Sequence, residues 1–257
     1  MIMKDNNKDV VVKSECKDIT IQIDHLKKSF DCIEVLKDIN IKITKGENLV
    51  VIGKSGSGKS VLIKCLVGLL VADDGKMIVL GNDISELKNK GLNGIRKHIG
   101  FLFQSAALYD SMTVRENLEF PLRDSREISK EEKNRLVKEA LNNVGLDSIM
   151  DKMPSELSGG MRKRLGLARA LILKPDIMLY DEPTTGLDPI TAKEISELIL
   201  DVQKKFNTTS LIITHDVACA KITANRIVVI KDGLITAEGT FSELEKSEDE
   251  WVRSFFE

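Results

Sequence analysis

A glycine-rich segment at residues 53–60 constrains this chain more than any other feature of its sequence. It follows a short apolar run at residues 49–52 and leads into a second apolar segment. It matches the pattern GxxxxGK[ST] in full and stands between a predicted strand and a predicted helix, the context that this motif requires. Its glycines let the backbone wrap a polyphosphate, and the helix N-terminus adds its positive dipole end. The predicted nucleotide-binding residues are Gly53, Lys54, Ser55, Gly56, Ser57, Gly58, Lys59, Ser60 and the adjacent Val61.

Two adjacent carboxylates follow another apolar run, at residues 177–180. A buried strand that ends there would place Asp181 at the carboxyl edge of the sheet, where ligands of α/β folds bind. Asp181 is suited to holding Mg²⁺, together with the hydroxyl of Ser60. Glu182 can point at the γ-phosphate and polarise an attacking water, while Lys59 reaches the β- and γ-phosphates.

The apolar pattern predicts an α/β fold. Residues 20–26 and 39–43 alternate, which predicts strands with one buried face, and Ile19, Ile21 and Ile23 share one side of the first. Continuous apolar runs are typical of strands that are buried on both faces of a parallel sheet. These runs lie at residues 49–52, 177–180, 211–213 and 227–230, and Asp232-Gly233 predicts a hairpin turn into residues 234–238.

Between about residues 85 and 165 the pattern becomes helical, which predicts an inserted helical subdomain. Ser129 and Glu132 are expected to form a capping box, and Gly145 to end that helix. The polar residues 1–18 are expected to be a disordered tail, residues 19–245 the nucleotide-binding domain, and residues 246–257 a C-terminal segment.

A second anion-binding helix tip is predicted at residues 157–161. Ser158 is a good N-cap, and Gly159 and Gly160 expose backbone N–H groups at the start of a helix. The chain already has one phosphate loop, so a second such tip is best explained by two copies arranged head to tail. Each copy would then close the nucleotide of the other.

The run at residues 157–161 resembles the signature of the ABC ATPase family, and its companion motifs appear in the family's order across residues 19–245. The resemblance implies a P-loop NTPase core of the RecA type, with a mixed sheet, an antiparallel β subdomain and an inserted α-helical subdomain. It implies catalytic roles for Glu182, His215, Gln104 and Lys59, and metal contacts from Ser60, Gln104 and Asp181. It further implies nucleotide contacts from Phe30, which would stack on adenine, and from Ser158, Gly159, Gly160 and Asp188. The implied ligands are ATP and Mg²⁺.

Within that family, the chain is similar in three strings to the Mla (maintenance of lipid asymmetry) group. The strings lie at residues 102–108, 153–164 and 180–189, and Met161 stands in place of the usual glutamine. This resemblance implies phospholipid transport across a bacterial envelope. The implied partners are a second copy of the chain, an integral membrane permease, an MCE-domain lipid-binding protein and, in some members, a STAS-domain subunit. The implied location is the cytoplasmic face of the inner membrane.

Composition narrows the alternatives. With 38 basic and 40 acidic residues, a net charge of −2 and 4% aromatics, the chain has no feature that favours nucleic-acid binding. Cys16, Cys32, Cys65 and Cys219 have no disulfide or zinc spacing, which favours a reducing cytosol, with Cys65 as a core residue. The N-terminus resembles no signal peptide, and the apolar residues 61–72 are too short to cross a bilayer, so membrane contact is expected through a partner.

Three alternatives remain open from the sequence. The chain could serve a transporter of another cargo, such as an amino acid, a metal or a drug, because the motor residues would be the same. It could be a soluble ABC ATPase of translation or DNA repair, although such proteins usually carry two cassettes or long insertions. It could also be a non-hydrolysing subunit, against which Lys59, Asp181, Glu182 and His215 all argue.

Overall fold

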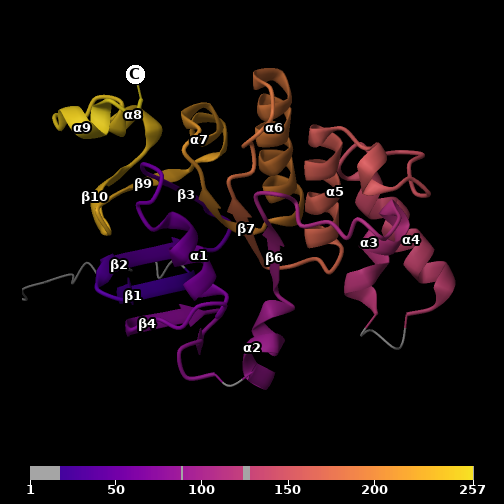
Figure 1. Ribbon diagram of the computed structural model, residues 1–257, viewed down its shortest axis with the longest axis horizontal. Helices are drawn as coiled ribbons and strands as arrows, with labels where there is room; N and C mark the ends of the chain where they lie inside the picture. The colour runs from indigo at the N-terminus through magenta and orange to yellow at the C-terminus, as the bar shows by residue number, and fades with distance from the viewer. Residues whose placement is uncertain (1–17, 88, 124–127, 257) are drawn as a thin grey trace, which may run out of the picture.

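The computed structural model describes residues 18–87, 89–123 and 128–256, and its strands form one continuous sheet (Figure 1). The strand order is β5-β4-β1-β2-β10-β9-β3-β8-β7-β6. Residues 1–17 of the predicted tail, including Cys16, lie outside the described residues. No helix in the described residues is both long enough and apolar enough to span a membrane.

The parallel part of the sheet is largely buried and extends to the edge strand β6. It contains β3 (Asn48–Ile52), β6 (Ile99–Leu102), β7 (Ile177–Asp181), β8 (Thr209–Ile213) and β9 (Arg226–Lys231). All five residues of β3, β7 and β8 are buried, as the continuous apolar runs predict. Antiparallel β10 (Leu234–Gly239) follows β9 through Asp232 and Gly233, which both have positive φ and confirm the predicted hairpin turn.

The two faces of this sheet belong to different hydrophobic cores, because successive side chains of a strand point to opposite sides. Val50 and Ile52 of β3 pack into one core with α5 (Gly159–Leu171) and α6 (Pro189–Phe206). Leu49 and Val51 pack into the other core with α1 (Lys59–Leu66) and the antiparallel strands. The phosphate-loop strand is therefore held from both sides.

The antiparallel arm consists of β1 (Ile19–Phe30), β2 (Ile33–Thr44), β4 (Asp74–Val79) and β5 (Asn82–Asp83). Ile21 and Ile23 are buried as predicted, but Ile19 is 44% exposed, because the β1–β2 register shifts between Ile19 and Ile21. A narrow seam joins the arm to the parallel sheet: one parallel pair, Leu234 with Asp38, beside a backbone hydrogen bond of 2.9 Å from Lys37 N to the carbonyl oxygen of Gly233.

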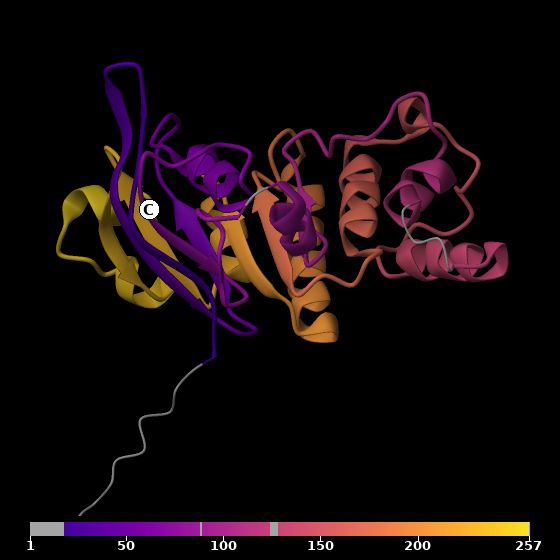
Figure 2. The ribbon, with the colours of Figure 1, turned by 90° about the horizontal axis from the view of Figure 1, so that it is seen from below.

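A group of helices follows β6 and forms the far end of the molecule from the β1–β2 hairpin, as Figure 2 shows. Its elements are α3 (Val114–Glu119), the 3₁₀ helices η1 (Phe120–Leu122) and η2 (Pro154–Glu156), α4 (Lys130–Asn142) and α5. The remaining helices are α2 (Asn89–Arg96), α7 (Val217–Thr223), α8 (Phe241–Leu244) and α9 (Glu250–Arg253).

Two expectations for the helical region were wrong in detail. The block at residues 85–165 is not helical throughout, since β6 within it pairs with β7 as part of the central sheet. The predicted capping box at Ser129 is only half formed. Ser129 accepts a hydrogen bond from Glu132 N, but the carboxylate of Glu132 instead pairs with the guanidinium of Arg135, 2.6 Å away.

Candidate nucleotide-binding site

The phosphate loop emerges from β3 and ends at Gly58, the N-cap of α1. Gly58 has φ 95°, and a Cβ at this position would lie 2.7 Å from Leu36 Cδ2 and 2.9 Å from Val35 O, so both the backbone conformation and the space require glycine. No side chain caps α1. The first amides of this helix are therefore available to an anion, which is the arrangement that binds phosphate at helix N-termini.

Lys59 closes this loop on itself. Its side chain is buried, and Nζ donates to the carbonyl oxygens of Gly53 at 2.7 Å and Lys54 at 3.1 Å. Burial lowers the pKa of Lys59, while the negative charges of Glu182 and Asp181 act in the opposite direction. An ammonium group has three protons, so two carbonyl partners leave one for a phosphate oxygen.

The loop also contains a hydroxyl that does not face the cavity that Lys59 and Glu182 line. Within the described part of the chain, the buried Ser57 Oγ has no hydrogen-bond partner. It lies 2.7 Å from the position of a Cβ added to Gly53, so it points beneath the loop. The uncapped helix and Lys59 therefore match the chemistry of a triphosphate.

Ser60 and Asp181 meet at the end of β7. Ser60 Oγ donates to Asp181 Oδ1 at 3.1 Å, and the side chain of Asp181 is largely buried. Burial raises the pKa of Asp181, and so does the neighbouring charge of Glu182, while the hydrogen bond from Ser60 lowers it. In the described ranges no group of three His, Cys, Asp or Glu side chains could hold a metal ion. A Mg²⁺ here would bind to one carboxylate, a hydroxyl and phosphate oxygens, which is its usual mode beside nucleotides.

Glu182 follows Asp181 with a backbone that turns out of the strand. Its φ is 51°, a left-handed conformation that costs about 1–3 kcal/mol in a non-glycine residue. Its backbone N still donates to Ile213 O of β8 at 2.8 Å. The carboxylate Oε2 lies 2.8 Å from His215 Nδ1 and accepts from Thr185 Oγ1 at 3.2 Å. A strained residue held by several partners is characteristic of a functional site.

A cavity of about 470 Å³ brings many of the predicted residues together. Val35 of β2 forms part of its wall, a contribution that the sequence did not reveal, because Val35 comes from the antiparallel arm. The other lining residues are Ser55, Gly56, Gly58, Lys59, Ser60, Val61, Gln104, Glu182 and His215.

Gly53, Lys54, Ser57 and Phe30 are not lining residues of this cavity. Gly53 fits under Ile230, whose carbonyl oxygen would lie 2.4 Å from a Cβ added to the glycine. Lys54 and Ser57 line a neighbouring groove beside Trp251 of α9. Phe30 lies at the end of β1, 42% exposed, and the Lys28 ammonium is 5.4 Å from its ring centroid.

The tip of α5 and the start of α6 form a separate surface, none of whose residues lines the cavity. Ser158 caps α5 and accepts from Met161 N at 3.3 Å, while Asp188 caps α6 and accepts from Thr191 N at 3.1 Å. The two caps are adjacent, since a Cβ at Gly160 would lie 2.6 Å from Thr191 Cγ2. Within one chain, therefore, Ser158, Gly159, Gly160 and Asp188 lie together, away from the chain's own phosphate loop.

Lys163 was not among the predicted site residues. It lies in α5 between Arg162 and Arg164, where three consecutive cations resemble a solvated helix face. In the structure it is buried, and its Nζ donates to the carbonyl oxygens of Gln104 at 2.5 Å and Glu182 at 3.1 Å.

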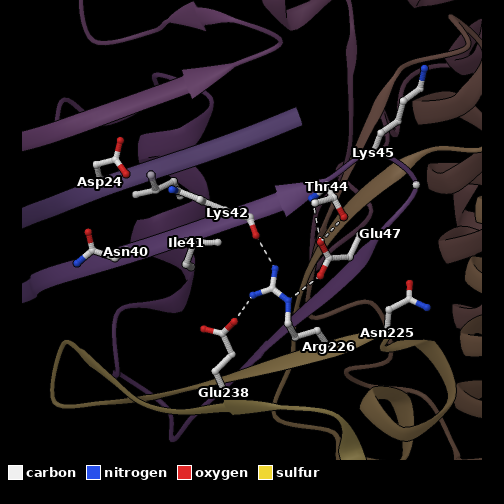
Figure 3. Close-up of a pocket in the computed structure, with 12 residues that line it drawn as sticks. Asp24, Asn40, Ile41, Lys42, Thr44, Lys45, Glu47, Asn225, Arg226 and Glu238 are labelled. Atoms are coloured by element: carbon white, nitrogen blue, oxygen red, sulfur yellow. Dashed lines mark hydrogen bonds and ion pairs between the residues drawn. The ribbon is translucent and has the colours of Figure 1, made fainter. Parts of the chain in front are cut away.

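A larger polar groove of about 900 Å³ lies at the other edge of the sheet, where β3 and β9 begin (Figure 3). Arg226 crosses it and bonds to Glu47, to Glu238 and to the carbonyl oxygen of Lys42. These contacts occupy the guanidinium group and tie β9 to the strands on either side. We assign this groove a structural role, away from the predicted chemistry.

Comparison with known proteins gives consistent matches. The model of the family described as "ABC transporter" matches residues 36–185. The probable ribonucleotide transport ATP-binding protein mkl of Mycobacterium tuberculosis is 40% identical, and the match covers 92% of this chain but only 66% of that protein. The intermembrane phospholipid transport system ATP-binding protein MlaF of Haemophilus influenzae is 38% identical, over 86% of this chain and 84% of its own.

A solved structure also matches. The dimeric, post-hydrolysis structure of the ATP-binding cassette MJ0796 bound to ADP and Pi has a TM-score of 0.79 at 31% identity, and covers 86% of this chain and 98% of that one.

Proposed function

This chain belongs to the ABC transporter family as one of its ATPase cassettes, and from that premise we propose that it hydrolyses ATP to drive phospholipid transport. The observation that carries the proposal is the convergence of Lys59, Ser60, Glu182 and His215 on one cavity at the carboxyl edge of the sheet. Cation, hydroxyl, carboxylate and imidazole are the groups that phosphoryl transfer to water requires.

In the proposed reaction, the loop amides and Lys59 bind the β- and γ-phosphates. Mg²⁺, when bound, supplies positive charge between these phosphates, and Ser60, Asp181 and Gln104 would hold it. Glu182 orients the attacking water and accepts its proton, with the hydrogen bond to His215 fixing the direction of the carboxylate. His215 is largely exposed, so it can also approach the γ-phosphate.

We propose that the active form is a head-to-tail dimer. The support is the separation of the α5 tip and Asp188 from the chain's own cavity. In such a dimer, each tip would close over the γ-phosphate bound by the other copy and supply backbone donors to the transition state. The dimeric MJ0796 structure is the precedent for this arrangement. Adenine would stack on Phe30, whose ring is partly exposed.

Phospholipid is the proposed cargo because of the similarity to MlaF and the motif strings around Met161. The proposed partners are an integral permease and an MCE-domain lipid-binding protein, with the chain on the cytoplasmic face of the membrane; a STAS-domain subunit belongs only to some members of this group. The mycobacterial relative is named for ribonucleotide transport, so nucleotide cargo is one competing assignment, beside the amino-acid, metal or drug cargo that the sequence left open.

The ATPase proposal is tested with Glu182→Gln. We expect ATP affinity to stay within a few-fold of the parent while the turnover rate falls at least about 100-fold, because a general base has been lost. Phosphate release and size-exclusion chromatography with Mg·ATP would measure turnover and the trapped dimer. Glu86→Gln, an exposed glutamate, is the matched control, and full turnover in Glu182→Gln would contradict the role of Glu182.

The cargo proposal is tested by purifying the tagged chain from membranes of its native host with its partners. We expect a permease and an MCE-domain protein to co-purify, and the reconstituted complex to move labelled phospholipid in an ATP-dependent way. Movement of labelled ribonucleotides instead, with no effect of phospholipid on ATPase rate, would reject the lipid assignment while leaving the ATPase proposal intact.

A further inference from the structure

A buried lysine joins two segments that carry proposed catalytic side chains. Lys163 is only 5% exposed, and its Nζ donates to the main-chain oxygens of Gln104 and Glu182, at 2.5 and 3.1 Å. Gln104 follows β6 and Glu182 follows β7, so one side chain of α5 reaches the ends of two adjacent strands. Its partners are backbone atoms, so it fixes where these residues lie and leaves both side chains free to act.

The burial of this ammonium is offset by hydrogen bonds to main-chain oxygens and not by an ion pair. Among the described residues, no carboxylate oxygen forms an ion pair with Lys163, although burial of an unpaired charge is expensive. Burial lowers the pKa of Lys163, and the charges of Glu182 and Asp181 oppose that effect. An apolar residue here would leave both carbonyl oxygens without this donor, so the cation contributes through its two hydrogen bonds.

The segment after Gln104 is held by α5 at further points. Ala106 and Ala107 both have left-handed backbones, with φ of 61° and 47°. Arg169 donates to the carbonyl oxygens of both at 2.8 Å, and a Cβ at Gly166 would lie 2.9 Å from Ala106 Cβ. Of these contacts from α5, only that of Lys163 also involves Glu182, whose own backbone is left-handed.

We propose that Lys163 is a positioning residue that holds Gln104 and Glu182 in register with the tip of α5. The inference rests on the proposed ATPase function and adds to it a physical link between the tip of α5 and the residues proposed to act in hydrolysis. When the tip closes over a nucleotide bound by another copy, α5 moves as one rigid helix. Lys163 then carries that movement to the residue that orients water and to the residue proposed to contact Mg²⁺. ATP can bind without this link, but it is hydrolysed efficiently only with it.

The test replaces Lys163 by methionine, which is unbranched and nearly as long as lysine but has no hydrogen-bond donor. We expect kcat to fall about 10- to 100-fold, the range expected when catalytic groups are misplaced by an ångström, with KM for ATP within about two-fold. Lys163→Arg, which keeps N–H donors, should recover most of the lost kcat. Arg169→Met is the control, because it frees the carbonyl oxygens of Ala106 and Ala107 without touching Glu182, and its kcat should fall less than about three-fold.

A second measurement does not depend on turnover. In a Glu182→Gln background with ATP bound, Lys163→Met should speed amide hydrogen exchange at residues 104–107 while ATP affinity is unchanged. If Lys163→Met fails to fold, Lys163→Gln replaces it with the same expected direction. An unchanged kcat, equal losses in Lys163→Met and Arg169→Met, or unchanged exchange would overturn the inference. Absence of ATPase activity in the parent chain would count against the proposed function, and the exchange measurement would still decide on Lys163.

Discussion

At the scale of single residues, the buried carboxylate of Asp181 serves the proposed Mg²⁺ contact but lowers the stability of the fold. Burial raises its pKa, so the folded chain holds this proton more tightly than the unfolded chain does. Between the ordinary and the raised pKa, folding therefore becomes more favourable as the pH falls. Above the raised pKa, where the carboxylate is ionised, its desolvation lowers the free energy of unfolding.

We therefore expect Asp181→Asn to raise the free energy of unfolding at pH 7 by about 0.5–2 kcal/mol, as replacements at strained functional positions often do. The same variant should lose Mg²⁺-dependent ATPase activity. The gain should shrink as the pH is lowered through the raised pKa, because the parent then becomes neutral as well. Denaturant titrations at several pH values measure this, with Asp232→Asn in the exposed hairpin turn as the control. A variant less stable than the parent at pH 7 would contradict it.

At the scale of elements, α5 depends on one glycine for its close contact with β6. A Cβ at Gly166 would lie 2.9 Å from Ala106 Cβ and 3.0 Å from Leu102 Cδ1. We expect Gly166→Ala to lower the free energy of unfolding by about 1–3 kcal/mol, because the packed neighbours must move.

The control is Gly94→Ala in α2, where an added Cβ meets nothing within 4 Å. Alanine is the better helix former, so this variant should be stabilised by up to about 1 kcal/mol. Thermal unfolding of the two variants beside the parent decides the prediction. Equal effects of both substitutions would show that the α5–β6 contact is not tight.

The elements also show how far the sequence can be interpreted alone. The buried strands were predictable, because their apolar runs are continuous, and Ser158 and Asp188 were recognisable as caps. The strand β6 was missed, since it has four residues with Gly100 among them, and only its pairing with β7 makes it a strand. Lys163 and Arg226 were missed for a related reason, because a basic side chain is expected in solvent. Only the tertiary fold buries Lys163 and gives the Arg226 guanidinium its hydrogen-bond partners.

At the scale of the whole molecule, the proposed head-to-tail dimer predicts complementation. Lys59→Ala disables the loop of one copy, and Gly159→Asp places a negative charge on an exposed tip where a Cβ is tolerated, 3.4 Å from Leu187 Cδ2. Each variant alone has a defect at both sites of its dimer. In a mixed dimer, both defects fall on one site and the other site is intact.

Mixing the two inactive proteins in equal amounts should therefore restore about one quarter of the parental ATPase rate, since half of the dimers are mixed and each has one intact site. Phosphate release before and after mixing measures it, and Gly159→Ala is the control for the added charge. If activity stays absent on mixing while both variants still form mixed dimers, the tip acts within its own chain or both sites must be intact together.

The joint between the arm and the parallel sheet has a consequence for how a nucleotide would be held. The phosphate loop leaves the parallel sheet, whereas Val35 and Phe30 belong to the arm, and the two parts share one strand pair, Leu234 with Asp38, and one hydrophobic core. A bound nucleotide would thus bridge the two parts of the sheet, with its phosphates at the loop and its base on the arm. A shift of the arm at this joint would therefore move the proposed base contact at Phe30 relative to the loop amides that hold the phosphates.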